Sequence, residues 1–441
     1  MRHNRLWIVI LSAILFLYVV CFIYTLKYPD VARIGDAIEY IQQAKNISMH
    51  RTVYCGDLSG EKNFDLYTRR PPMYSLILAM GLLVFNNIQS VLTIQIILTF
   101  LNGFFIYAIA GYFNISIRWR LILTTIFLLY PSQIIFTNIM MSEVVLQSFL
   151  LCAFFLLLKF SKTAKIYYLI FYNLCMVAAV LTKPIFLYFW IPNIALHVWL
   201  YLRDRKKAIL ILPFILVLAI SSWSYRNYQQ TGVFHYSSIK NHNLLRYNIR
   251  GLLTSKYDAA TAEQMITRIN QNAMKKDSYA GQYEHIEKKS FSIILDNFLL
   301  YSVIHLKGTI TFFIDPGRFD LFNFLQLDSE ISMLELYQQH GFKSIFHVFE
   351  EIPFTLLMYL GFMTIVNLAF LLAFILFVCK PNESRIYKIF PITMILYVAI
   401  LTGPIGASRF RLPVFPYLVL TLPVLIEPFI QRSKQNKKGI K

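Results

Sequence analysis

Runs of about 20 uncharged, apolar residues recur along this chain and limit what it can fold into. The first covers residues 6–26 and follows a basic N-terminal flank. In helical form, a run of this length crosses a hydrocarbon layer of about 30 Å. No cleavage site of small residues follows it, so we expect a retained helix rather than a signal peptide. With 57% hydrophobic and only 15% charged residues, the chain is predicted to be an all-α polytopic membrane protein.

The positive charge of the chain fits the same class of protein. A net charge of +19 could indicate nucleic-acid binding, but the basic residues lie largely in short clusters beside apolar runs, which is typical of cytoplasmic loops. We therefore expect no nucleic-acid partner. The clusters comprise Arg2 with Arg5, Arg118 with Arg120, and residues 159–165, 203–207, 380–388 and 432–441. The five cysteines are scattered and no metal-ligand spacing occurs, so neither a disulfide framework nor a metal is expected.

Placing the basic clusters in the cytoplasm predicts ten spans, with both termini inside. The spans fall near residues 6–26, 91–113, 119–138, 143–159, 166–182, 184–201, 208–224, 352–378, 387–402 and 412–430. Two further apolar segments, 73–85 and 294–314, are interpreted as juxtamembrane or re-entrant, because the first is short and the second contains His305 and Lys307. If both cross, the bundle has twelve spans, and parity does not decide between the two counts.

This topology divides the chain into three regions. Residues 1–224 form an N-terminal transmembrane module whose first outer loop covers residues 27–90. Residues 225–351 form an outer-face region, with a capping-box pattern at 261–264 that predicts a helix start there. Residues 352–441 contain the last spans and a basic cytoplasmic tail. The polar segments able to carry chemistry are all predicted to face outward.

Two carboxylates in the first outer loop, Asp36 and Glu39 of the segment GDAIEY, are the leading candidates for acid–base chemistry. An acidic pair at this spacing is also typical of a helix start, with Asp36 as the N-cap and Glu39 as its capping-box partner. Spacing alone favours the capping interpretation. The two roles are compatible.

Cations and one further acid lie at the outer ends of predicted spans. Arg70 follows Arg69 and precedes two prolines, and it either extends to the lipid headgroups or binds a phosphate. Glu143 begins a span in IMMSEVVLQ, and Lys183 separates two apolar runs in LTKPIF. Either residue could be solvated, but charges at a membrane edge are functional candidates, and Lys183 suits a phosphate in the headgroup zone.

Two arginine-containing clusters also lie at predicted outer boundaries. Arg226 belongs to SSWSYRNYQQTG, and Arg409 and Arg411 belong to SRFRLPVFP. Arg409 and Arg411 are predicted to lie on the outer side, contrary to the positive-inside rule. The two arginines either reach anionic lipid headgroups or bind the phosphate of a lipid substrate.

The order of these motifs resembles the GT-C superfamily of membrane glycosyltransferases, in particular the branch that contains protein O-mannosyltransferases and aminoarabinose transferases. The shared pattern is a first helix, an acidic outer loop followed by PP, boundaries containing SE, KP and W..RN, and a late R.R.P motif. The resemblance covers most of the chain. It implies a GT-C-like bundle of about 10 to 12 helices with outward-facing loops.

The resemblance also implies an activity and roles for residues. It implies an inverting transfer of a sugar from a polyprenyl-phosphate donor to a glycan, lipid or protein acceptor, on the outer side of the cytoplasmic membrane of a bacterium. Asp36 matches the catalytic base of the family, and Glu39 is the next carboxylate, whereas many relatives have two adjacent acids. The candidate ligands of the donor phosphate or substrate are Arg70, Glu143, Lys183, Arg226, Arg409 and Arg411. The family implies neither a metal nor a cofactor.

One alternative belongs to a different class, a transporter or flippase of a lipid-linked saccharide without a transfer step of its own. Such transporters typically carry midplane charges, broken helices and repeated halves. The sequence shows no internal repeat, and its charges lie at the predicted outer boundary, which favours transfer. The chain also lacks a glycine-rich phosphate loop, which argues against direct use of a nucleotide sugar or ATP.

Overall fold

The computed structural model describes residues 2–327, 353–380 and 385–425, and every regular element in them is a helix. This confirms the all-α fold class. The N-terminal half contains α1 (Arg2–Lys27), η1 (Pro29–Arg33), α2 (Ala37–His50), α3 (Phe64–Thr68), α4 (Met73–Phe85), α5 (Ser90–Tyr112), α6 (Ile117–Leu129), α7 (Pro131–Thr137), α8 (Glu143–Thr163), α9 (Ile166–Thr182), η2 (Pro184–Phe189), α10 (Trp190–Asp204), α11 (Ala208–Ile211) and α12 (Phe214–Thr231).

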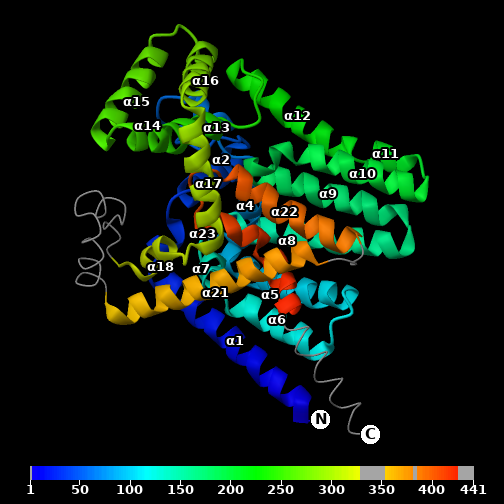
Figure 1. The fold of residues 1–441 in the computed structure, drawn as a ribbon. Helices are drawn as coiled ribbons and strands as arrows, with labels where there is room; N and C mark the ends of the chain where they lie inside the picture. The colour runs from blue at the N-terminus through cyan, green and yellow to red at the C-terminus, as the bar shows by residue number, and fades with distance from the viewer. Residues whose placement is uncertain (1, 328–352, 381–384, 426–441) are drawn as a thin grey trace.

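The remaining elements form a helical lobe and the last helices of the bundle (Figure 1). They are α13 (Ile239–Asn243), η3 (Leu244–Ile249), α14 (Arg250–Lys256), α15 (Ala259–Met274), α16 (Tyr279–Asp296), α17 (Phe298–Ile314), α18 (Arg318–Leu325), α21 (Phe354–Cys379), α22 (Arg385–Leu401), α23 (Ser408–Arg411), η5 (Leu412–Val414) and α24 (Phe415–Thr421).

Six of the described helical stretches are long and apolar enough to cross a membrane, or eight if each of two bent pairs is one span. The protein is therefore a multi-pass membrane protein. One bent pair corrects a predicted continuous span, and the other lies in the segment predicted to be juxtamembrane or re-entrant. The span at 119–138 bends by 58° between α6 and α7, where Pro131 lacks the N–H that a helix needs. The apolar segment 294–314 breaks at Asn297, and α16 and α17 meet there at 96°.

Other predicted spans match shorter apolar helices. Predicted span 166–182 is α9, and 387–402 corresponds to α22. Segment 73–85 is the short helix α4. In predicted span 412–430, α24 ends at Thr421, and residues 426–430 lie outside the described residues.

The two ends of the bundle differ in charge. α8 contains 21 residues and runs from Glu143 to Thr163, a length of about 30 Å. At its C-terminal end, Lys206 donates to the carbonyl of Ala164 at 2.7 Å and Arg203 donates to Ser161 at 3.2 Å. Two basic loops therefore lie side by side at the end opposite Glu143.

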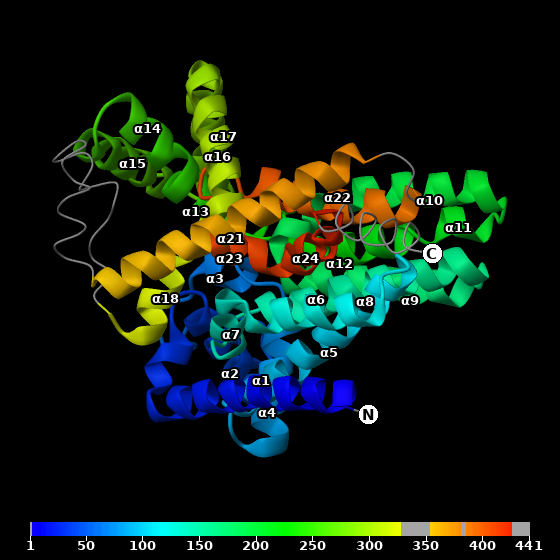
Figure 2. The same cartoon turned by 60° about the horizontal axis from the view of Figure 1, so that its bottom comes forward.

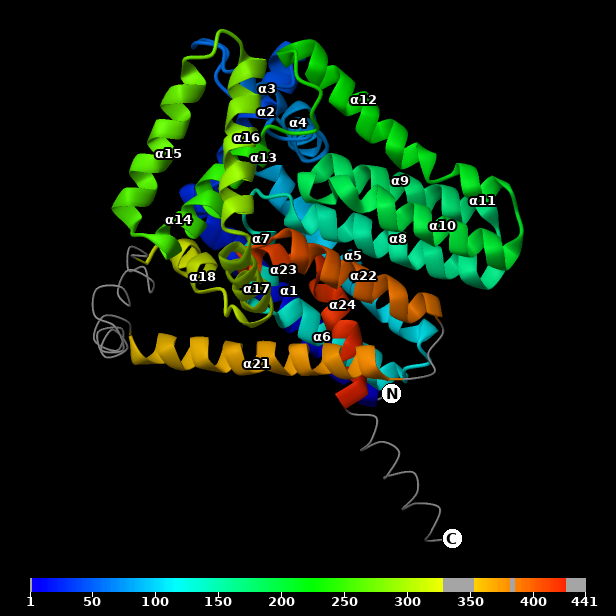
Figure 3. The same ribbon diagram turned by 45° about the horizontal axis from the view of Figure 1, so that its top comes forward.

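The helical lobe, α13 to α16, lies beside α3 and α17 (Figure 3). It has a small core of its own that includes Leu245, Ile249 and Ile266. The predicted helix start at 261–264 is displaced. α15 begins at Ala259, and the Asp258 side chain caps it by accepting the N–H of Thr261 at 2.8 Å.

The bundle core centres on α8, which packs between α5 and α9. A second core joins α2, α4 and α7 beneath the first loop, and α1 runs along the outside of the bundle (Figure 2). The contact of α2 with α4 carries the first loop onto the bundle. Large apolar side chains on the outer faces of α1, α4 and α21 stay exposed, as expected of helices that face lipid.

Candidate active site

Asp36 immediately precedes α2, where the chain turns through Gly35 with a positive φ of 56°. It occupies the N-cap position, but its side chain makes no capping hydrogen bond. Its Oδ1 instead accepts from Arg70 at 2.7 Å, and its Oδ2 pairs with Arg409. The capping interpretation is therefore wrong for the Asp36 side chain, which is turned away from α2 and towards two guanidinium groups.

Glu39 lies one helical turn further along α2 and faces the same arginine. Its carboxylate accepts from the Nε of Arg70 at 2.5 Å and from Arg69 at 3.3 Å. It is therefore not a capping-box partner either. Glu39 and Asp36 hold the Arg70 guanidinium between them, since residues three apart lie on one face of a helix.

Arg70 is buried, with 7% of its surface exposed. Its backbone carbonyl accepts from Gln43 at 3.0 Å, and its guanidinium lies over the ring of Tyr40 at 5.2 Å. These contacts fix the RRPP segment against α2. The alternative that Arg70 extends to lipid headgroups is therefore wrong.

The second half of the site joins the ends of three helices. Glu143 at the start of α8 is fully buried and binds the Lys183 ammonium and the Nε of Arg409, each at 2.7 Å. Lys183 follows α9 and is 9% exposed, and Arg409 belongs to α23. Both solvated alternatives are wrong, for Glu143 and for Lys183. The Oε2 of Glu143 has no hydrogen-bond partner among the described residues.

We call these six residues, three acids and three cations, the charge cluster. Its members are Asp36, Glu39, Arg70, Glu143, Lys183 and Arg409. Arg409 joins the two halves, because it binds Asp36 and Glu143 at once. Burial raises the pKa of Asp36, but the charges of Arg409 and Arg70 outweigh burial and hold that pKa well below its usual range. Asp36 is therefore an ionised carboxylate in this structure.

Arg226 and Arg411 lie outside the charge cluster. Arg226 donates to the backbone carbonyls of Tyr67 at 2.6 Å and Val53 at 2.7 Å. Arg411 is buried and donates to backbone carbonyls at the end of α17 and to the hydroxyl of Tyr130 at 2.7 Å. Both therefore tie the backbone of loops that flank the site. A role for either in binding phosphate stays a prediction.

Asp36, Arg70, Lys183 and Arg409 line one large cavity of about 1120 Å³, which we call the site cavity. Its other walls come from η2, from residues 233–248 and from α16, α17 and the loop before α23. Sequence reasoning missed the aromatic and imidazole side chains of this wall. They include Tyr188, His235, Tyr236, Tyr247, Tyr283, Tyr301 and His305. For all of them except Tyr188, which lies in η2, the only signal was the aromatic content of residues 225–351.

Two hydrogen bonds of the neighbouring Ser408 set the position of Arg409. The N–H of Ser408 donates to Asp315 at 2.6 Å, and the hydroxyl of Ser408 lies 2.6 Å from the carboxylate of Asp320. Burial raises the pKa of Asp320 to about 6. The preceding loop also lies against α17 so closely that a Cβ at Gly406 would lie 1.9 Å from the carbonyl oxygen of Gly308.

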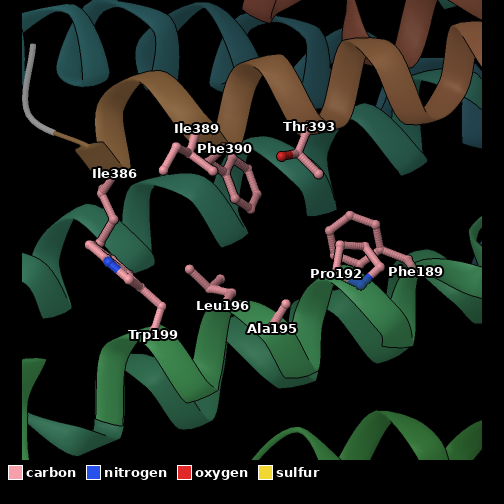
Figure 4. Close-up of a pocket in the computed structure, with 9 residues that line it drawn as sticks. All are labelled: Phe189, Pro192, Ala195, Leu196, Trp199, Ile386, Ile389, Phe390 and Thr393. Atoms are coloured by element: carbon pink, nitrogen blue, oxygen red, sulfur yellow. The ribbon is translucent and has the colours of Figure 1, made fainter. Parts of the chain in front are cut away.

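A separate apolar cavity of about 320 Å³ lies between η2–α10 and α22. Figure 4 shows side chains of both helices facing each other across it, among them Leu196, Trp199 and Phe390. η2 begins directly after Lys183, and its residues Tyr188 and Phe189 line the site cavity and the apolar cavity, respectively. Among the described residues, no group of three or more His, Cys, Asp or Glu side chains could hold a metal ion.

Comparisons with known proteins find similar structures but no similar sequence. No protein-family model matches the chain, and no curated protein sequence does. The archaeal oligosaccharyltransferase AglB from Archaeoglobus fulgidus, solved with an inhibitory peptide and a dolichol-phosphate, is similar with a TM-score of 0.44 and 13% identity. That match covers 90% of this chain and 47% of AglB, so the chain spans about half the length of AglB.

ArnT from Cupriavidus metallidurans, solved in the apo state, is similar with a TM-score of 0.39 and 11% identity, over 96% of this chain and 77% of ArnT. Both similar proteins are GT-C membrane glycosyltransferases, the superfamily that the order of the sequence motifs resembles. At these identities and TM-scores, the similarity assigns a role to no residue of this chain.

Proposed function

We propose that this protein is an inverting glycosyltransferase that moves a sugar from a polyprenyl-phosphate donor to an acceptor, with Asp36 as the general base. One observation carries the proposal. A carboxylate and three cations from segments far apart in the chain, Arg70, Lys183 and Arg409, line a single cavity at one end of a membrane bundle. A base and a phosphate site are the two groups that such a transfer needs.

The reaction forms one bond and breaks another at the anomeric carbon of the donor sugar. The acceptor hydroxyl attacks this carbon, and the bond from the carbon to the phosphate oxygen breaks with its electron pair leaving on the phosphate. Asp36 takes the proton of the hydroxyl. Attack from the side opposite the phosphate inverts the anomeric configuration.

Lys183, Arg70 and Arg409 are the proposed ligands of the donor phosphate. Negative charge grows on the phosphate as it leaves, and cations held in place before the reaction stabilise that charge most effectively. Glu143 and Glu39 hold these cations in position through contacts of 2.7 Å to Lys183 and 2.5 Å to Arg70. Their proposed role is to position the cations rather than to react.

From the ion pairs of Asp36 we also propose an order in which the donor and the acceptor bind. Both oxygens of Asp36 are engaged by Arg70 and Arg409, so the carboxylate is a weak base before substrate binds. A donor phosphate competes for Arg409 and releases Oδ2 of Asp36. Donor binding thereby activates the base, and it precedes productive binding of the acceptor.

The apolar cavity supplies a place for part of the lipid chain of the donor. It adjoins η2, which starts at the residue after Lys183 (Figure 4). A phosphate at Lys183 would thus direct its lipid into the bundle. We further propose that the site faces the outer side of the cytoplasmic membrane, because the basic loops lie at the opposite end. The acceptor would be a glycan, lipid or protein on that side.

Comparison of cells tests this function directly. Mass spectrometry of envelope glycans, lipids and proteins would compare cells with the wild-type protein, with Asp36→Asn and without the protein. We expect one glycosylated product to vanish in both altered strains while the Asp36→Asn protein stays in the membrane. Retention of that product with Asp36→Asn would contradict the proposed base. Movement of a lipid-linked sugar across liposomes, without any product, would instead support the transport alternative.

A further inference from the structure

A further cavity, of about 460 Å³, lies within the helical lobe, and we call it the lobe cavity. Its size falls in the range of small-molecule sites, about 300–1,000 Å³. All four helices of the lobe, together with η3 and α3, contribute to its walls. It is separate from the site cavity, but Tyr283 lines both.

The walls of the lobe cavity combine aromatic rings with many polar groups. Tyr279 and Tyr283 supply rings, and Asn270 and Gln282 supply amides. Asn241 is buried, with 6% of its surface exposed, and donates to the carbonyl of Tyr283 at 3.0 Å. Its Oδ1, however, has no hydrogen-bond partner among the described residues. A buried amide oxygen without a partner is costly, so a hydroxyl of a bound ligand is a favourable partner for it.

The charged side chains on the walls of the lobe cavity include one cation that is not paired with an acid of the described residues. Asp65 accepts from the hydroxyl of Tyr279 at 2.6 Å, and Glu263 pairs with Arg250 at 3.4 Å. Arg246 lines the same cavity and forms no ion pair within the part of the chain that the structure describes. A guanidinium group suits the planar carboxylate of a ligand, which it can bind through two parallel hydrogen bonds.

The lobe cavity is connected to the charge cluster through ion pairs. Asp65 lies 3.8 Å from Arg69, and Arg69 lies 3.3 Å from Glu39. Glu39 in turn binds Arg70, which holds Asp36. A ligand in the lobe cavity therefore sits next to the loop that carries the proposed base.

We propose that the lobe cavity binds an acidic sugar unit of a glycan acceptor, with the carboxylate of the sugar on Arg246 and its hydroxyls on Asn241 and the neighbouring amides. The role as an acceptor site rests on the function proposed above. The bound unit is not the one that reacts, because this cavity is distinct from the one that contains Asp36. The lobe thereby selects acceptors by a unit remote from the transfer.

Direct binding tests this inference without any turnover. Saturation-transfer NMR on the purified full chain would use methyl β-D-glucuronide as the acidic probe and methyl β-D-glucoside as the neutral one. We expect the acidic probe to bind and Arg246→Ala to weaken its binding by about tenfold. Arg246→Lys keeps the charge and should retain part of the binding. Arg268→Ala, an exposed arginine of the same lobe outside the cavity, is the matched control and should bind as the wild type does.

Equal binding of the acidic and the neutral probe would overturn the proposal, as would equal losses in Arg246→Ala and Arg268→Ala. The Asp36→Asn variant separates this site from the proposed function. If Asp36→Asn abolishes transfer but binding of the acidic probe does not depend on Arg246, the proposed lobe site is wrong and the proposed function stands. If the wild-type protein shows no transfer while binding of the acidic probe depends on Arg246, the acceptor role is wrong and the binding site remains.

Discussion

Arg409 is the residue on which the two halves of the charge cluster meet, since it binds Asp36 and Glu143 together. It offsets the effect of burial on Asp36 and keeps the pKa of that carboxylate low. A carboxylate with a depressed pKa stays ionised at neutral pH. It takes up a proton only when the pH falls well below the ordinary pKa of a carboxyl group. The cluster therefore protects the proposed base from protonation.

Replacement of Arg409 by glutamine should change the pH dependence of transfer as well as its rate. Without Arg409, less positive charge offsets the burial of Asp36, so the pKa of this carboxylate rises and the acid limb of kcat/KM moves to higher pH. The pH profile of the purified protein measures this shift. Arg268→Gln should leave the profile unchanged. A lower rate with an unmoved acid limb would mean that Arg409 does not tune Asp36.

The Glu143–Lys183 pair offers a test of stability at the same scale. Glu143→Gln leaves the buried Lys183 ammonium without a carboxylate, and loss of one partner of a buried pair costs about 3–5 kcal/mol. We expect a lower Tm in detergent for Glu143→Gln and recovery of part of the loss in Glu143→Gln/Lys183→Met. Thermal unfolding of the four proteins of this cycle measures the coupling. If the decreases in Tm of the two single variants add up to that of the double variant, Glu143 and Lys183 are not coupled.

At the scale of elements, the geometry of the site depends on the loop before α23, which is held against α17. The loop before α23 packs on α17 through glycines, and Gly406 adopts a positive φ of 49°. Ser408 is then fixed by Asp315 and Asp320, which lie in and just before α18. The position of Arg409 is therefore set by residues about 90 positions earlier in the chain.

Gly406→Ala should lower transfer by about 10- to 100-fold, because its new Cβ would meet the carbonyl of Gly308 and displace Arg409 from the charge cluster. Gly361→Ala in α21 is the control, since a Cβ there meets nothing within 4 Å. Steady-state transfer assays compare the two variants at equal protein levels in the membrane. Equal activity of the two would show that the loop tolerates displacement.

Sequence reasoning located every member of the charge cluster, because each lies in a short polar motif at the end of an apolar run. It did not reveal how they pair. Asp36 and Arg409 are 373 positions apart, and no local pattern records a contact of that range. For the same reason the side chains of Asp36 and Glu39 looked like helix caps. The aromatic wall of the site cavity was missed because it is assembled from η2 and from several separate segments of residues 225–351.

At the scale of the whole molecule, the account requires the charge cluster and the basic loops to lie on opposite sides of the membrane. Gly60 of the first loop is exposed with open space around it, and Thr163 is the exposed last residue of α8, beside a basic loop. In a variant without the five native cysteines, Gly60→Cys should react with an impermeant maleimide in intact cells. Thr163→Cys should react only after permeabilisation. The reverse pattern would place the site in the cytoplasm.

The most direct test of the central claim is transfer by the purified protein in liposomes. The donor would be a polyprenyl-phosphate sugar labelled in the sugar, with a cell-envelope extract as the source of acceptor. We expect labelled product with the wild-type protein and a loss of at least about 100-fold with Asp36→Asn, at unchanged Tm and membrane insertion. Transfer by Asp36→Asn at close to the wild-type rate would contradict the claim that Asp36 is the base.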